Sequence, residues 1–162
     1  MSERGIYKTP QSKQIIETMY RGHLASPLAA GLQQQFVETP FGKTFVLCAP
    51  QAGKPSLVLL HGSTSNSATW LGVIPLYRKN FSVYCLDIPG EPGLSSEHRL
   101  KLSSDAPATW LASTLDALCI ERSAFVGMSL GGWYALSFAI AHPERVTALS
   151  LISSAGIAAQ KT

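Results

Sequence analysis

The stretch that decides the fold runs from Glu121 to Arg145 and reads ERSAFVGMSLGGWYALSFAIAHPER. It opens with Ala124-Phe125-Val126, a short apolar run of the kind found in buried strands. The long apolar segment that follows predicts a helix that ends at His142-Pro143. Ser129 is therefore expected at a sharp corner between a strand and a helix.

A corner this sharp crowds the residue at its apex, so small residues are needed two positions before it and two positions after it. Gly127 and Gly131 stand at these positions. The corner would direct the Ser129 hydroxyl toward the helix N-terminus, where free N–H groups and the helix dipole favour negative charge. An oxyanion formed by attack of Ser129 on an acyl carbon could then accept a hydrogen bond from the N–H of Leu130.

Two other interpretations of this stretch were weighed against a nucleophile. From Ser123 to Ala141 there is no charged residue, which is almost enough to cross a bilayer. The same segment contains three serines and three glycines and begins as a strand, so we do not expect a membrane span. Ser129 could also merely complete a tight turn, because Gly-x-Ser-x-Gly alone is a weak pattern.

Bulk properties indicate one ordinary globular domain. The chain has 162 residues, of which 46% are hydrophobic and 14% charged, enough to bury a real core. The net charge of +3 comes from scattered basic residues, so we expect neither nucleic acid nor a membrane surface as a partner. We expect no metal and no cofactor.

The cysteines and the first residues bear on the compartment. Cys48, Cys85 and Cys119 lie in apolar runs without metal-binding spacing, which favours buried free thiols in a reducing compartment. The opening MSERGIYKTP carries early charge and no apolar core of a signal peptide. A cytoplasmic location is the resulting expectation.

The chain before the domain predicts a short helix over residues 12–23. Ser12 can cap this helix, and Ile15, Ile16 and Met19 share one stripe. We expect residues 1–32 to form an N-terminal extension that packs on a domain of residues 33–162.

The next segments alternate between strands and helices. A hairpin is predicted over residues 34–38 and 44–49, and buried strands over 57–60, 81–87 and 146–152. Helices are predicted after Asn66 or Ser67 and from Asp105, as a cap, to Leu118. This alternation is typical of an α/β fold with a mostly parallel, doubly wound sheet.

Three signatures together resemble the α/β-hydrolase fold of the esterase and lipase-like kind. They are Leu59-Leu60-His61-Gly62-Ser63, Asp87-Ile88-Pro89-Gly90 with Gly93 and Ser95, and Gly127-Met128-Ser129-Leu130-Gly131-Gly132, in the family's order. The resemblance implies that Ser129 is the nucleophile. It also implies that the N–H groups of Leu130 and Ser63 form the oxyanion hole, with Thr64 a less favoured substitute for Ser63.

The same resemblance bears on three neighbouring residues. It implies a structural role for Asp87, at the end of its strand. Glu91-Pro92 departs from the family's usual loop, and we infer only a locally different loop there. For His61 we prefer a histidine that fixes its own turn over a general base.

The partners of a serine nucleophile are missing from the sequence. In this fold an acid and then a histidine follow the serine, but no aspartate follows Ser129. His142 and Glu144 stand about 18 Å away, at the far end of a helix of a dozen residues. His98 is interpreted as a solvated loop residue and His23 as part of the extension. A base and an orienting acid cannot be assigned.

We therefore expect an incomplete α/β-hydrolase domain, without its last strands and cap. The all-apolar helix after Ser129 and the strand over residues 146–152 favour coverage by further chain, by self-association or by a complementing chain. The function expected is hydrolysis of carboxylic esters or related small acyl substrates through an acyl-enzyme, with little turnover by residues 1–162 alone. Three alternatives stay open: a non-catalytic binding or receptor protein, a C–C hydrolase, and a cofactor-free haloperoxidase-like enzyme.

Overall fold

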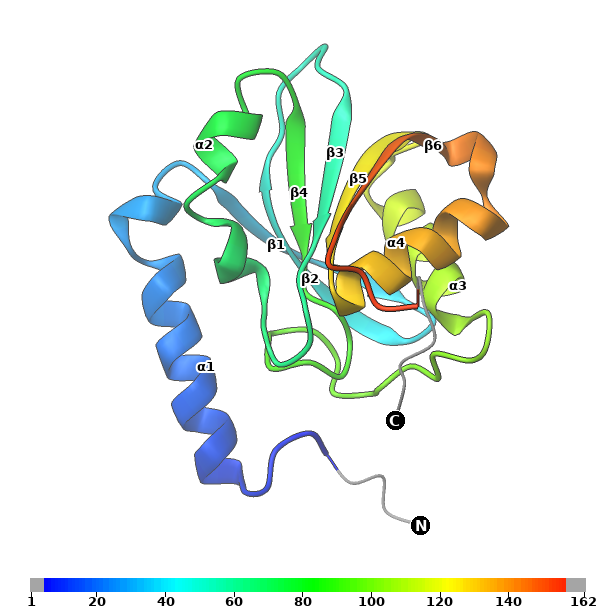
Figure 1. The fold of residues 1–162 in the computed structure, drawn as a ribbon. Coiled ribbons are helices and arrows are strands. Elements are labelled where there is room, and N and C mark those ends of the chain that lie inside the picture. The colour runs from blue at the N-terminus through cyan, green and yellow to red at the C-terminus, as the bar shows by residue number, and fades with distance from the viewer. Residues whose placement is uncertain (1–4, 157–162) are drawn as a thin grey trace.

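The computed structural model describes residues 5–156, which form a six-stranded sheet with helices on both faces (Figure 1). The strands are β1 (Gln33–Thr39), β2 (Gly42–Ala49), β3 (Ser56–Leu60), β4 (Ser82–Leu86), β5 (Ser123–Met128) and β6 (Val146–Ile152). Their order across the sheet is β1-β2-β4-β3-β5-β6. β1 pairs antiparallel with β2, and β2 with β4, whereas β4, β3, β5 and β6 run parallel. The predicted hairpin and mostly parallel sheet are confirmed.

Helices cover the two faces of the sheet with separate apolar clusters. The α-helices are α1 (Pro10–Leu24), α2 (Ile74–Tyr77), α3 (Ala106–Ala117) and α4 (Leu130–Ala141), and the short 3-10 helices are η1 (Pro27–Ala29), η2 (Ser67–Trp70) and η3 (Pro143–Arg145). α3 and α4 bury Trp110, Leu111 and Phe138 against one face. α1, η2 and α2 bury Leu24, Trp70 and Ile74 against the other. The fold is therefore doubly wound, as the sequence predicted.

The N-terminal helix differs from its prediction in its cap and in its buried face. Thr9, and not Ser12, is the N-cap, and Ser12 completes a reciprocal capping box with it. The expected stripe is exposed: Ile15 and Met19 are 60% and 61% accessible. Tyr20 faces the domain instead, because its hydroxyl donates to the buried Asp87 carboxylate at 2.9 Å.

The helix expected after residue 66 is broken into η2 and α2. Asn66 caps it as predicted, since its side-chain oxygen accepts from the Ala68 N–H at 3.1 Å. Gly72 and Pro75 then disfavour a continuous helix, one through backbone entropy and the other through its missing N–H. The two short helices still bury the apolar residues that the pattern indicated.

Two further expectations are corrected. Asp105 occupies the N-cap of α3 but makes no side-chain cap, and the Ala106 N–H donates to Ser104 Oγ instead. Cys48 and Cys85 are buried free thiols, but Cys119 is exposed, since it follows the C-terminal end of α3 in a left-handed turn with φ 55°.

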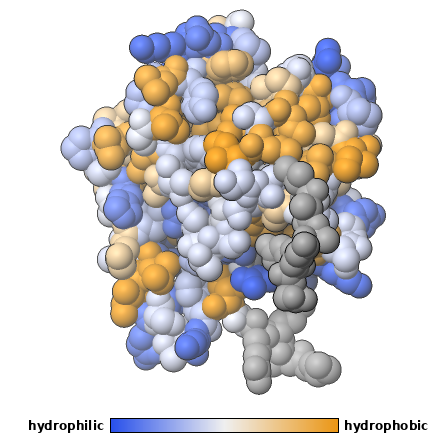
Figure 2. All heavy atoms as spheres, in the orientation of Figure 1, coloured by the Kyte–Doolittle hydropathy of each residue, from blue (hydrophilic) through white to orange (hydrophobic). Residues whose placement is uncertain are grey.

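The strand β6 has its predicted bounds but is not buried. Most of its residues are exposed or half-buried, because β6 lies at an edge of the sheet and pairs only with β5 among the described strands. Ile140 of the neighbouring α4 is exposed as well. Figure 2 shows apolar residues gathered over this side of the molecule.

Candidate active site

Ser129 lies at the corner between β5 and α4, as the sequence predicts. Its backbone has φ 49° and ψ −112°, an unfavourable conformation for a residue with a side chain. Two hydrogen bonds fix this conformation: the Ser129 N–H donates to the Ile152 carbonyl at 3.0 Å, and the Ala155 N–H donates to the Ser129 carbonyl at 3.1 Å. The strained corner is therefore held by the last residue of β6 and by the segment that follows it.

The two glycines around Ser129 allow a close approach of backbones. A Cβ on Gly127 would lie 2.5 Å from the Gly131 carbonyl oxygen. A Cβ on Gly131 would overlap the Leu60 carbonyl at the end of β3. The strand, the helix and the neighbouring strand end meet too closely for any side chain, which is the crowding that the sequence predicted.

The loop after β3 lies against the corner. A Cβ on Gly62 would lie 3.5 Å from the Ser129 Cβ, so Ser63 follows directly beside the serine. Ser63 and Leu130 both line a pocket of about 230 Å³. Within residues 5–156, the N–H groups of Ser63 and Leu130 have no hydrogen-bond acceptor. Two free amide donors thus accompany the hydroxyl at the carboxyl ends of β3 and β5.

Thr64 has its N–H engaged elsewhere. This N–H donates to Glu91 Oε2 at 2.5 Å, and the Thr64 hydroxyl donates to the Ser63 carbonyl at 2.7 Å. The Thr64 N–H is therefore not available to an oxyanion, and this contact favours Ser63 as the donor.

His61 fixes its own turn, as expected. The Ile88 N–H donates to Nε2 at 2.9 Å, so the other nitrogen carries the proton and Nδ1–H donates to the Gly62 carbonyl at 2.8 Å. Burial lowers the pKa of the His61 imidazole below its usual value. With both nitrogens occupied, His61 cannot take a proton from Ser129.

Asp87 joins three segments beneath the loops. Its Oδ1 accepts from the Ser67 N–H, the Ser67 hydroxyl and the Tyr20 hydroxyl, and its Oδ2 accepts from the Leu94 N–H. Burial and the Asp87 charge raise the pKa of the Tyr20 hydroxyl. These contacts agree with the structural role expected for Asp87.

The other histidines lie away from Ser129. His142 follows the last residue of α4, where its ring packs on Phe138 and its Nδ1 lies 3.8 Å from Glu144 Oε1. His23 is in the last turn of α1, and His98 is an exposed loop residue. His61 and His142 bond to groups other than the serine, and residues 5–156 contain no group of three residues suited to a metal ion.

Met128 and Trp133 flank the Ser129 corner, where an apolar side chain can line an acyl pocket or belong to the core. Both pack against the apolar clusters. The pocket beside Ser63 is lined instead by Tyr134 and Leu130 from α4 and by the loop after β4. Burial and the nearby Glu91 charge raise the pKa of the Tyr134 hydroxyl, so it stays protonated.

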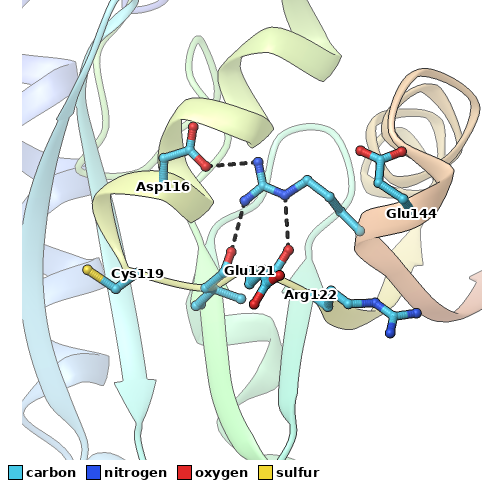
Figure 3. A pocket seen from close by; sticks show the side chains of 7 residues that line it. Asp116, Cys119, Glu121, Arg122 and Glu144 are labelled. Carbon is cyan, nitrogen blue, oxygen red and sulfur yellow. Dashed lines mark hydrogen bonds and ion pairs between the residues drawn. The ribbon is translucent and has the colours of Figure 1, made fainter.

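A larger hollow of about 920 Å³ lies at the opposite end of the parallel strands from Ser129. Arg145 lines this hollow, and its guanidinium donates to the Ile120 and Glu121 carbonyls and pairs with Asp116 at 2.8 Å, as the dashed lines in Figure 3 mark. The amino ends of β5 and β6 lie here, whereas ligands of open α/β sheets bind at the carboxyl ends. The hollow is therefore not the candidate site.

One residue of the site was missed by the sequence analysis. Glu91 was assigned only to an unusual loop, but its buried carboxylate accepts the Thr64 N–H at the wall of the pocket. The sequence signal was the presence of a charged residue between glycines in a loop otherwise rich in small and apolar residues.

The described helices were also compared with the length and apolarity that a membrane span requires. None of the helices within residues 5–156 reaches both.

Known proteins similar to this chain include carboxylesterases of Bacillus subtilis. Carboxylesterase YbfK of Bacillus subtilis is 34% identical over 120 residues, which are 74% of this chain and 40% of YbfK. The crystal structure of carboxylesterase CesB (YbfK) matches with a TM-score of 0.82 and 31% identity, covering 90% of this chain and 50% of that one. Naproxen esterase from Bacillus subtilis matches with a TM-score of 0.80 and 29% identity, covering 92% and 52%.

The chain thus spans about half, or less, of the length of these relatives. The sequence model described as alpha/beta hydrolase fold matches residues 55–161, which contain the loop after β3, the loop after β4 and the Ser129 corner. From the sheet order, the strained serine corner and this match, the chain belongs to the alpha/beta hydrolase fold family.

Proposed function

We propose that this chain carries the nucleophile and the oxyanion hole of a serine hydrolase that acts on carboxylic esters or related acyl compounds. Ser129 attacks the acyl carbon, and the N–H groups of Ser63 and Leu130 hold the oxyanion. The observation that carries the proposal is the strained Ser129 corner with two unpaired amide donors beside one pocket. Carboxylesterases among the similar proteins favour esters over the other substrates of this serine chemistry.

The pocket shape agrees with a small acyl group. Its volume of about 230 Å³ and its apolar lining by Leu100, Leu102, Leu130 and Pro89 suit a short hydrocarbon chain or ring. The acyl group would lie between the loop after β4 and the start of α4.

A serine hydroxyl needs a base, and that base needs an orienting acid. Within residues 5–156 neither reaches Ser129. We therefore propose that both come from outside these residues, and that residues 1–162 alone hydrolyse esters at close to the background rate.

The test is p-nitrophenyl acetate hydrolysis by the complete gene product that contains this chain. Ser129→Ala is expected to lower kcat by at least about a thousandfold, because nucleophile removal in serine hydrolases costs this much or more. Ser137→Ala, in the middle of α4 and away from the corner, is the matched control and should retain activity. Equal rates for Ser129→Ala and the unmodified protein would refute the proposed function.

The rival function is a binding protein that keeps the hydrolase scaffold without catalysis. The absence of a histidine near Ser129 within the described residues is the observation that favours it. A fluorophosphonate separates the two functions, since only an activated hydroxyl reacts quickly. Rapid labelling of the complete gene product at Ser129 supports the hydrolase, and its absence supports the binding protein.

A further inference from the structure

Glu91 is a buried carboxylate in the loop after β4, and its side chain is only 6% exposed. Charged side chains are rarely buried to this extent unless they are paired or hydrogen-bonded. Glu91 lies at the pocket that Ser63 and Leu130 also line. Its partners therefore bear directly on the candidate oxyanion hole.

The carboxylate of Glu91 has two partners. Oε2 accepts the Thr64 N–H at 2.5 Å, a charge-assisted hydrogen bond of short length. Oε1 lies 3.5 Å from Arg99 Nη2, which also donates to the Gly90 carbonyl at 2.9 Å. The Arg99 side chain is 66% exposed, so water screens this ion pair and the Thr64 contact is the stronger of the two.

Thr64 needs an anchor because its backbone is in the left-handed region, with φ 54°. A β-branched residue adopts this conformation only when its surroundings impose it. The hydrogen bond to Glu91 supplies such a constraint from a loop 27 residues further along the chain. Since the Thr64 N–H belongs to the peptide bond that joins Ser63 to Thr64, holding it also fixes one side of Ser63.

We propose that Glu91 is a positioning residue, which holds the loop after β3 so that the Ser63 N–H faces the oxyanion. This inference rests on the proposed function. Glu91 acts through Thr64 and does not touch the reacting atoms. A negative charge lining the same pocket would oppose the oxyanion, and Arg99 is the cation placed to balance it.

The kinetic test uses Glu91→Ala and Glu91→Gln in the complete gene product. Glu91→Ala should lower kcat about 10- to 100-fold with little change in KM, because a displaced oxyanion donor is missed mainly in the transition state. Glu91→Gln keeps a neutral acceptor for the Thr64 N–H and should lose about 3- to 10-fold, a partial rescue. Glu97→Ala is the matched control, since Glu97 lies in the same loop but pairs with Lys13.

A second readout needs no catalysis and uses residues 1–162 directly. The Thr64 amide proton should resonate far downfield in the NMR spectrum, because it bonds to a carboxylate at short distance. Glu91→Gln should move this signal upfield, and Glu97→Ala should leave it in place. The proposal would be overturned if the Thr64 amide proton had an ordinary chemical shift that stayed the same in Glu91→Gln.

The two proposals fail in different ways. If Ser129→Ala leaves hydrolysis unchanged, the proposed function fails. If Ser129 is required and folded Glu91→Ala keeps the unmodified kcat, only the role of Glu91 is refuted. Should Glu91→Ala not fold, Glu91→Gln decides, and an unmodified kcat in that variant overturns the positioning role.

Discussion

Two hollows lie at opposite ends of the parallel strands and differ in how their polar groups are used. Beside Ser129, the pocket of about 230 Å³ has two N–H groups that remain unpaired within residues 5–156. Beside Arg145, the hollow of about 920 Å³ is crossed by a guanidinium that is bonded to two carbonyls and a carboxylate. The smaller hollow offers free N–H donors to a ligand. In the larger hollow, the Arg145 donors are already bonded to groups of the protein.

This difference follows from sheet geometry. At the carboxyl ends of β3 and β5 lie the N–H groups of Ser63 and Leu130, unpaired within residues 5–156, and α4 begins there with its positive end. The amino ends of β5 and β6 receive chain from α3 and η3, and Arg145 binds these two incoming segments together. Volume alone would select the wrong end of the molecule.

The first prediction tests whether backbone packing builds the Ser129 end. Gly131→Ala should lower the free energy of unfolding by about 3 kcal/mol or more, because the added Cβ overlaps the Leu60 carbonyl and neither backbone can move freely. The measurement is urea denaturation of residues 1–162, monitored by circular dichroism.

The control for Gly131→Ala is Gly72→Ala. Gly72 has no atom within 4 Å of an added Cβ, so this change should alter stability by no more than about 0.5 kcal/mol. Similar small losses for both variants would show that the corner is not closely packed.

Much of this end could be predicted from the sequence, because local patterns determine it. The corner is specified within five residues, by Gly127, Ser129 and Gly131. The bounds of α4 and β6 agree with the apolar runs. Burial of β6 was predicted wrongly. Its apolar side chains indicate a surface that can be buried, but they do not indicate which segment would cover that surface.

Contacts between distant segments could not be predicted from local patterns. The exposed stripe of Ile15 and Met19 looked like the buried face of α1, but the hydrogen bond of Tyr20 to Asp87 orients the helix otherwise. The contact of Glu91 with Thr64 joins two loops in the same way. Spacing along the chain does not encode either contact.

The second prediction tests whether the Arg145 hollow serves stability alone. Arg145→Ala should lower the free energy of unfolding by about 1–2 kcal/mol, since it leaves the Ile120 and Glu121 carbonyls without a protein donor. Arg122→Ala is the control, because Arg122 lines the same hollow without a hydrogen bond or ion pair to any residue in the described range. It should change stability by less than about 0.5 kcal/mol.

The reactivity of Ser129 should not change when Arg145 is replaced by alanine. Fluorophosphonate labelling of Ser129 in the folded Arg145→Ala variant of the complete gene product is expected to proceed at the unmodified rate. A large loss of labelling would connect the two hollows and contradict the division of roles drawn between them.

The smallest effect expected is the response of the Ser129 end to acid. Burial lowers the pKa of His61 at the Ser129 end, so below pH about 6.5 the unfolded chain binds more protons at this residue than the folded chain. This part of the stability is complete above that pH and is lost as the pH falls, by at most about 1.4 kcal/mol per pH unit.

Urea denaturation of residues 1–162 between pH 5 and pH 7.5 measures this slope. His61→Gln should be less stable throughout, because the Ile88 N–H and the Gly62 carbonyl lose their ring partners, but its stability should depend less on pH than that of the unmodified chain. His23→Gln, in the exposed last turn of α1, is the control for replacing an imidazole at the surface. Equal slopes for His61→Gln and the unmodified chain would mean that burial of His61 does not contribute to the pH dependence of stability, which would contradict the prediction.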